Sequence, residues 1–208
     1  MFFSHSQNRL EALSDGVFAF AATLMVVDIG SSVELVSFQK ELPNFISFAV
    51  SFFVMMGLWK LHYNFFRRTK HIDNWIITFN MILLFTVLFY IFPVKSLLSS
   101  ALGQSELASA NDFSQLFQIY SIGFSLIFAS FSLMYYRVYK KDKEHPNKYQ
   151  LLFYTRHFLI FVLVGAASFI LARIQIGLQY GVPGFMYASL GPLCYLHSVQ
   201  FQKKHSLE

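Results

Sequence analysis

The sequence predicts an all-α membrane protein with six transmembrane helices and both termini in the cytoplasm. Hydrophobic residues make up 55% of the 208-residue chain and charged residues only 13%, whereas soluble domains average about 25% charged residues. A soluble domain of this length would still need a polar surface, so we expect lipid to cover much of the protein. Six apolar segments and an uneven distribution of basic residues complete the argument.

Six segments are long enough to cross a bilayer, because a hydrocarbon core of about 30 Å needs about 20 helical residues. The second segment begins at Pro43, a residue favoured at the first position of a helix. Short connections join the segments, so we interpret residues 1–208 as a single domain, with Leu207-Glu208 set aside as a candidate cloning remnant. The predicted spans are 9–28, 43–65, 72–98, 113–136, 149–172 and 182–201.

The basic residues predict the orientation of these spans. Eleven Lys and Arg residues lie at one set of span ends, near the N-terminus, in 66–71, in 137–148 and near the C-terminus. The opposite set holds three, Lys40, Lys95 and Arg173. Because positive residues remain in the cytoplasm, we expect both termini inside, which agrees with an even number of spans.

The first span, Arg9 to Ile29, contains more polar and small residues than an anchor needs. Ser14 and Asp15 lie a turn or more inside its start and are followed by Gly16 and several alanines. Small residues allow helix backbones to approach closely, and polar residues in a membrane helix face protein or water. We therefore expect this helix to contact other protein and a water path.

Arg9, Ser14 and Asp15 have two interpretations. Ser14 or Asp15 could cap the start of the helix, where a negative charge is favourable. Alternatively the three form a buried polar cluster, which then needs partners from other helices because Arg9 and Asp15 are too far apart for an ideal pair on one helix. The second and third spans offer Trp59, Lys60, His62, Asn64, Asn74 and Asn80.

The sequence lacks the parts of a catalytic or metal site. Cys194 is the single cysteine, and His62, His71 and His157 do not have metal-ligand spacing. A glycine-rich phosphate loop, an HExxH motif and a Ser/His/Asp arrangement are all missing from the sequence. His62 is best interpreted as a hydrogen-bonded core residue, with proton sensing as the alternative.

A stripe of four residues on the first span has two interpretations, helix packing and a pore wall. Gly16, Phe20, Thr23 and Val27 share one helix face through their 4-3-4 spacing, and Leu24 flanks them. Ordinary helix packing explains the stripe. The alternative is a pore wall of bulky apolar side chains with one ring of hydroxyls, which gates by dewetting.

The first span resembles the first-helix signature of the transmembrane protein 175 family, lysosomal and prokaryotic potassium channels. The family pattern is Arg, three residues, then Phe-Ser-Asp, and here Leu13 occupies the Phe position before Ser14-Asp15. Further likeness lies in Trp59 and His62, and in Asn80 followed by Phe92-Pro93. The last three spans resemble the family only in hydropathy.

The resemblance implies a homotetramer, because members with one six-helix repeat assemble as four copies whose first helices line a central pore. It also implies a polar network that holds the pore helix, made by Arg9, Ser14 and Asp15 with Trp59, His62 and Asn80. The family lacks the TVGYG carbonyl filter, as does this chain. Selectivity would then depend on Phe20, Thr23, Leu24 and Val27, with Phe20 standing where a branched aliphatic residue is expected.

We therefore interpret the chain as a passive, potassium-selective channel of a prokaryotic plasma membrane, with potassium ions and the lipid bilayer as its partners. It is expected to need no cofactor, no bound metal and no nucleic acid, and to be no enzyme. The main alternative is a secondary transporter, which normally has inverted repeats and helices broken near mid-membrane. Pro93, Pro183 and Pro192 do not lie in such matched positions. A structural or assembly protein is the third possibility, if the polar cluster only caps a helix.

Overall fold

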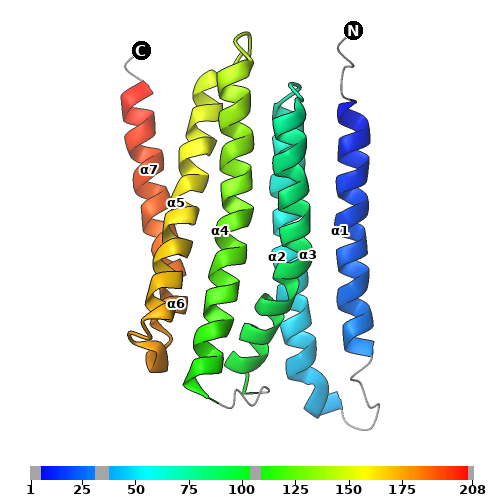
Figure 1. The fold of residues 1–208 in the computed structure, drawn as a ribbon, viewed down its shortest axis with the longest axis vertical. Helices are drawn as coiled ribbons and strands as arrows, with labels where there is room; N and C mark the ends of the chain where they lie inside the picture. Colours follow the sequence, from blue (N-terminus) through cyan, green and yellow to red (C-terminus); the bar gives the residue numbers. More distant parts are fainter. Residues whose placement is uncertain (1–5, 31–37, 104–108, 206–208) are drawn as a thin grey trace.

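The computed structural model describes residues 6–30, 38–103 and 109–205, and it shows long helices running up and down beside one another (Figure 1). All regular secondary structure in these residues is helical. The elements in chain order are α1 (Gln7–Gly30), α2 (Phe38–Arg68), α3 (Asn74–Ala101), α4 (Ala110–Lys141), α5 (Lys148–Arg173), the 3-10 turn η1 (Leu178–Tyr180), α6 (Val182–Phe185), the 3-10 turn η2 (Met186–Ser189) and α7 (Leu190–His205).

Among the described residues, five helices are long and apolar enough to cross a membrane. They correspond to the first five predicted spans, so the all-α membrane architecture is confirmed for that part of the chain. Their apolar stretches are Gln7–Val27, Leu42–Arg68, Asn74–Ala101, Ala110–Lys141 and Lys148–Arg173.

The sixth predicted span, 182–201, is not one uninterrupted helix, which corrects the expectation of six equivalent spans. The segment is divided into α6, η2 and α7, and α7 alone has 16 residues, about 24 Å of helix. Pro192 explains the division, because a proline has no N–H for the carbonyl four residues before it and its ring crowds that carbonyl. That carbonyl belongs to Ala188, inside η2.

The helices form two groups that meet between α3 and α4. In the first group α1 packs mainly against α2 and α3, and in the second α4 and α5 form the most extensive helix pair while α7 packs along α5. Figure 1 shows α1 and α7 at opposite sides of the bundle, with the start of α1 and the end of α7 at the same end. Within one chain, α1 therefore has helices against one side only.

Small residues allow α4 and α5 to approach closely. A Cβ atom added at Gly165 would collide with the Ser125 hydroxyl on α4. The Ser121 hydroxyl donates to the Ser168 hydroxyl at 3.0 Å, and Ser168 donates to the Pro183 carbonyl at 2.8 Å. These bonds join α4, α5 and α6 in the manner of small and hydroxyl residues at membrane helix interfaces.

An ion pair joins the two groups at the end where α2 stops and α3 begins. Asp73 caps α3 by accepting the Ile76 N–H at 3.0 Å, and its other oxygen accepts Arg137 Nε of α4 at 2.6 Å. Burial raises the pKa of the Asp73 carboxyl, but the Ile76 N–H and the Arg137 guanidinium more than offset it, and the pKa lies below its ordinary value. The connection between α2 and α3 is therefore held against α4.

Arg68, the last residue of α2, supports the same junction. Its guanidinium lies 4.2 Å from the centre of the Tyr154 ring of α5 and donates to the Tyr135 hydroxyl of α4 at 3.2 Å. Its carbonyl accepts His145 Nε2 at 2.9 Å, while His145 Nδ1 accepts the Asn147 N–H at 3.1 Å. These two bonds place the His145 proton on Nε2.

We expect Asp73→Asn to lower the free energy of unfolding at pH 7 by up to about 1 kcal/mol, because the ion pair and the charged cap are lost. The folded-state pKa of Asp73 is depressed, so its stabilisation is present above the unfolded pKa of about 4 and is lost as the pH falls through the folded pKa. Thermal unfolding in detergent should show the full difference between parent and variant at pH 7, and a difference that shrinks as the pH falls below the unfolded pKa of about 4.

The exposed Glu144 provides a control, since its side chain has no partner in the described residues. Glu144→Gln should leave stability unchanged at every pH. A deficit of Asp73→Asn that does not shrink at all as the pH falls below the unfolded pKa of about 4 would contradict the assigned role of the carboxylate.

Candidate functional site

The first helix has two faces with different surroundings. Its buried face carries Leu10, Ser14, Phe18, Ala21 and Met25, at the 4-4-3-4 spacing of one helix side. Since α1 packs mainly against α2 and α3, this face is turned to those helices. One polar residue, Ser14, lies in the middle of this otherwise apolar row.

A chain of hydrogen bonds runs from α2 through α3 to α1 at this point. His62 Nε2 lies 2.8 Å from Asn80 Oδ1, Asn80 Nδ2 donates to Ser14 Oγ at 3.0 Å, and Ser14 Oγ donates to the Leu10 carbonyl at 2.8 Å. All three side chains are at most 1% exposed. Because the Ser14 proton is used on Leu10, Asn80 must present its amide to Ser14 and its oxygen to His62. The proton of His62 therefore lies on Nε2.

Aromatic rings flank the His62 side chain beside this hydrogen bond. The ring centre of Phe18 on α1 lies 5.6 Å from that of His62, and the ring centre of Phe66 on α2 lies 4.8 Å away. A hydrogen bond in such surroundings is strengthened by the low local dielectric, and an unpaired polar group there is correspondingly costly. The three-residue chain thus fixes how α1 sits on α2 and α3.

The other residues expected in the network lie at its edge or outside it. Asp15 is exposed and accepts Trp59 Nε1 at 2.9 Å. Arg9 is exposed, and it makes no hydrogen bond or ion pair with any residue that the structure describes. Leu13, which takes the place of the family's Phe, is also exposed, at 53%. The structure therefore brings together Ser14, His62 and Asn80, adds Asp15 to Trp59, and leaves Arg9 apart.

The stripe expected to line a pore lies on the exposed side of α1. Phe20 is 57% exposed, Leu24 41% and Val27 63%. Thr23 is exposed as well, and its hydroxyl donates to the Ala19 carbonyl at 3.0 Å. That bond uses the hydroxyl proton and leaves oxygen lone pairs available to a cation.

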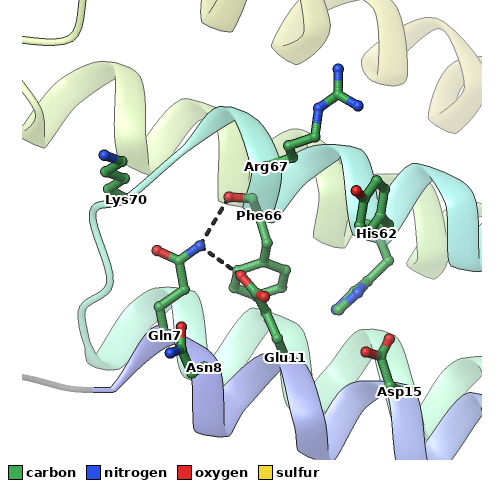
Figure 2. A pocket seen from close by; sticks show the side chains of 9 residues that line it. Gln7, Asn8, Glu11, Asp15, His62, Phe66, Arg67 and Lys70 are labelled. Atoms are coloured by element: carbon green, nitrogen blue, oxygen red, sulfur yellow. Dashed lines mark hydrogen bonds between the residues drawn. The ribbon is translucent and has the colours of Figure 1, made fainter.

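A polar cavity of about 430 Å³ lies between the start of α1 and the end of α2, close to the hydrogen-bond chain (Figure 2). Gln7 crosses it by donating to Glu11 Oε1 at 2.6 Å and to the Phe66 carbonyl at 3.0 Å. Sequence reasoning did not find this site, because its walls come from helix ends about 50 positions apart. The lining residues are Gln7, Asn8, Glu11, Asp15, His62, Tyr63, Phe66, Arg67 and Lys70.

Metal-ligand geometry is absent from the part of the chain that the structure describes. No group of three or more His, Cys, Asp or Glu side chains there is arranged to hold a metal ion. Cys194 on α7 is partly buried and unpaired.

We expect Asn80→Leu to lower the free energy of unfolding by about 1–3 kcal/mol, since it leaves the His62 N–H buried without an acceptor. Replacing both partners with apolar residues removes the orphaned donor, so His62→Phe with Asn80→Leu should cost less than the two single changes added together. Unfolding in detergent measures the three values. Thr78→Val, at an exposed hydroxyl on the same helix, is the control. Additive single effects would show that the two side chains are not coupled.

Comparison with known proteins finds similarity in the helices that carry the buried hydrogen-bond chain. Residues 9–93 match the family model described as endosomal/lysosomal potassium channel TMEM175. A protein of Marivirga tractuosa named as a potassium channel is 33% identical over 160 residues, 70% of this chain and 65% of its own length. Another, from Chamaesiphon minutus, is 31% identical over 125 residues, 56% of this chain and 62% of its own length. The chain thus covers slightly less than two thirds of each of these two relatives.

Two further comparisons extend over nearly the whole chain. A protein of a Chryseobacterium species named as a potassium channel is 27% identical over 183 residues, 84% of this chain and 89% of its own. The crystal structure of a variant of the potassium channel MtTMEM175, in complex with a Nanobody-MBP fusion protein, has a TM-score of 0.77 at 27% identity and covers 98% of this chain and 97% of that one.

A crystal structure of a TMEM175 homolog from Chamaesiphon minutus has the same fold, with a TM-score of 0.63 at 20% identity over 94% of this chain and 97% of that one. The matched residues 9–93 include all three members of the buried hydrogen-bond chain and the stripe on α1. The curated relatives are named as potassium channels, which agrees with the expectation that the chain is no enzyme. The comparisons thus show that residues 9–93 are similar to the TMEM175 family, and that the whole chain has the fold of MtTMEM175.

Proposed function

We propose that the protein is a potassium-selective cation channel that conducts passively through a homotetramer, with the four α1 helices lining the pore. The observation that carries the proposal is the exposed stripe on α1, opposite the face held by Ser14, His62 and Asn80. In a single chain this stripe lies uncovered, although it is apolar apart from Thr23. Relatives named as potassium channels support the choice of ion.

The chemistry of the stripe suits a gate followed by an ion-binding ring. Four copies of Phe20 around an axis would form a narrow apolar ring that repels water, and an ion crosses such a ring only by losing most of its hydration shell. Thr23, about one turn further along α1, would offer four hydroxyl oxygens to an ion that has passed. Leu24 and Val27 would continue the apolar wall.

The buried hydrogen-bond chain supports this assignment by limiting rotation of α1. A helix turns by about 100° per residue, so one residue of register shift would remove Ser14 from Asn80 and move Phe20 off the axis together. We infer that Arg9, exposed at the start of the same helix, and the Asp15–Trp59 pair contribute to assembly. The site of action would be the plasma membrane of a prokaryote, with both termini in the cytoplasm.

The alternative remains a secondary transporter of a small ion or solute. One observation supports this alternative: the sixth span is divided near Pro192, and the binding sites of transporters are built on discontinuous helices. However, the divided segment of α6, η2 and α7 lies on the side of the bundle away from α1. Unitary current steps in a planar bilayer would exclude the transporter, since carriers do not produce them.

The proposal predicts a tetramer. The intact protein in mild detergent should have a native mass of about four times 24.1 kDa, apart from bound detergent, because one copy of α1 cannot enclose a pore. Native mass spectrometry measures this directly. A monomer or dimer, under conditions in which another tetrameric channel remains assembled, would contradict the proposed pore.

Substitutions in the stripe should change permeation selectively. We expect Phe20→Ala to raise open probability and weaken potassium over sodium selectivity, because it widens the ring. Thr23→Val keeps the shape but removes the oxygen, so selectivity should fall several-fold with little change in pore width. The measurement is the reversal potential under a potassium/sodium gradient.

Leu163→Ala is the matched control, since Leu163 is 62% exposed on α5, in the helix group remote from α1. It should conduct as the parent does. If Phe20→Ala and Thr23→Val both keep the parental reversal potential, the stripe is not the filter, even in a protein that still conducts.

A further inference from the structure

The polar cavity between α1 and α2 has walls of opposite charge that do not meet. Glu11 and Asp15 lie on the α1 side, and Arg67 and Lys70 lie at the end of α2 and just beyond it. Within the residues that the structure describes, the side chains of Arg67 and Lys70 make no hydrogen bond and no ion pair. Figure 2 shows Glu11 and Asp15 on α1, Arg67 extending from α2 away from α1, Lys70 beyond the end of α2, and Gln7 bonded to Glu11 and to the Phe66 carbonyl.

The α1 side of the cavity is rich in hydrogen-bond acceptors. Glu11 uses one oxygen on Gln7, and Asp15 uses one on Trp59, so each carboxylate retains a further oxygen. His62 also lines the cavity, and because its Nε2 proton is committed to Asn80, Nδ1 is left as an acceptor. Three acceptors, two of them charged, match the three N–H donors of a primary ammonium group.

The α2 end offers the complementary chemistry. Arg67 presents a planar set of donors suited to phosphate oxygens, and Lys70, three residues later and beyond the end of α2, adds a second positive charge. The rings of Phe66 and Tyr63 complete the lining. A simple anion would be attracted by Arg67 and Lys70 but repelled by Glu11 and Asp15. A simple cation would be attracted by the two carboxylates but repelled by the two basic residues.

We propose that this cavity binds a zwitterion with a primary ammonium and a phosphate a few bonds apart, as in a phosphoethanolamine group. The ammonium lies against Glu11, Asp15 and His62 Nδ1, and the phosphate against Arg67 and Lys70. The cavity lies at the ends of two membrane-spanning helices, which is the depth of lipid headgroups. The group can therefore come from phosphatidylethanolamine or from a soluble phosphoethanolamine. This inference concerns binding and stands apart from ion conduction.

The test is lipid binding to the delipidated, full-length protein in detergent, followed by native mass spectrometry. Dioleoyl phosphatidylethanolamine should bind about tenfold more tightly than dioleoyl phosphatidylglycerol, which lacks the ammonium, and than dioleoyl phosphatidylcholine, whose quaternary ammonium has no N–H. Direct binding of free O-phosphoethanolamine without lipid, as tightly as the lipid binds, would assign the soluble source, and binding of the lipid without measurable binding of the free compound would assign the headgroup. Equal affinity for the three lipids would overturn the proposal and indicate a cavity filled by water and salt.

Variants on each wall separate the two contacts. Glu11→Gln should abolish most of the preference for phosphatidylethanolamine over phosphatidylglycerol, because it removes the charge that faces the ammonium. Arg67→Gln, at an exposed position, should weaken both lipids about equally, since it removes a phosphate contact. The matched controls are Glu144→Gln and Lys203→Gln, an acid and a base outside the cavity, and both should keep the parental preference. A preference that survives Glu11→Gln, or affinities for both lipids that are unchanged by Arg67→Gln, would also overturn the proposal.

Discussion

The rotation of one helix depends on a hydrogen-bond chain that has only one possible direction. Ser14 gives its proton to the Leu10 carbonyl, so it must accept from Asn80, and Asn80 must in turn accept from His62. Each of these three side chains is buried, and each of the three hydrogen bonds has one donor and one acceptor in this arrangement. In a bilayer, where unsatisfied polar groups are costly, this leaves α1 one stable orientation on α2 and α3. The exposed stripe on the opposite face is a direct consequence.

Much of the fold follows from composition and hydropathy, and the exceptions have physical causes. The five long helices overlap the first five predicted spans because each contains a long run of apolar residues without competing signals. The sixth span was predicted as continuous because Pro192 lies among apolar residues, and its effect appears only four positions earlier, at Ala188 in η2. A hydropathy average over a window of residues does not respond to the loss of a single backbone hydrogen bond, so it cannot locate the interruption of a helix.

The candidate site likewise has a part that could be predicted from the sequence and a part that could not. Ser14, Asp15, Trp59, His62 and Asn80 could be selected from the sequence because polar residues stand out in apolar helices and because they resemble a known pattern. The distances between them, and the separation of Arg9 from the others, depend on helix packing and could not be predicted. The polar cavity was missed for a related reason: Glu11 and Arg67 each look like ordinary charged residues near a helix end, and only their placement across a shared space makes them a site.

The short α7 has a mechanical consequence for the sixth span. Its 16 residues span about 24 Å, less than the roughly 30 Å of a typical hydrocarbon core. It packs along α5, a much longer helix, at the side of the bundle away from α1. η2 and α6 continue the segment directly from Leu190 back to Val182, so all three elements together are needed to cross the hydrocarbon core. A change from α to 3-10 winding therefore falls inside the sixth span, and a membrane of different thickness is accommodated most easily by bending at η2, since kinks form where the hydrogen-bond ladder of a helix is interrupted.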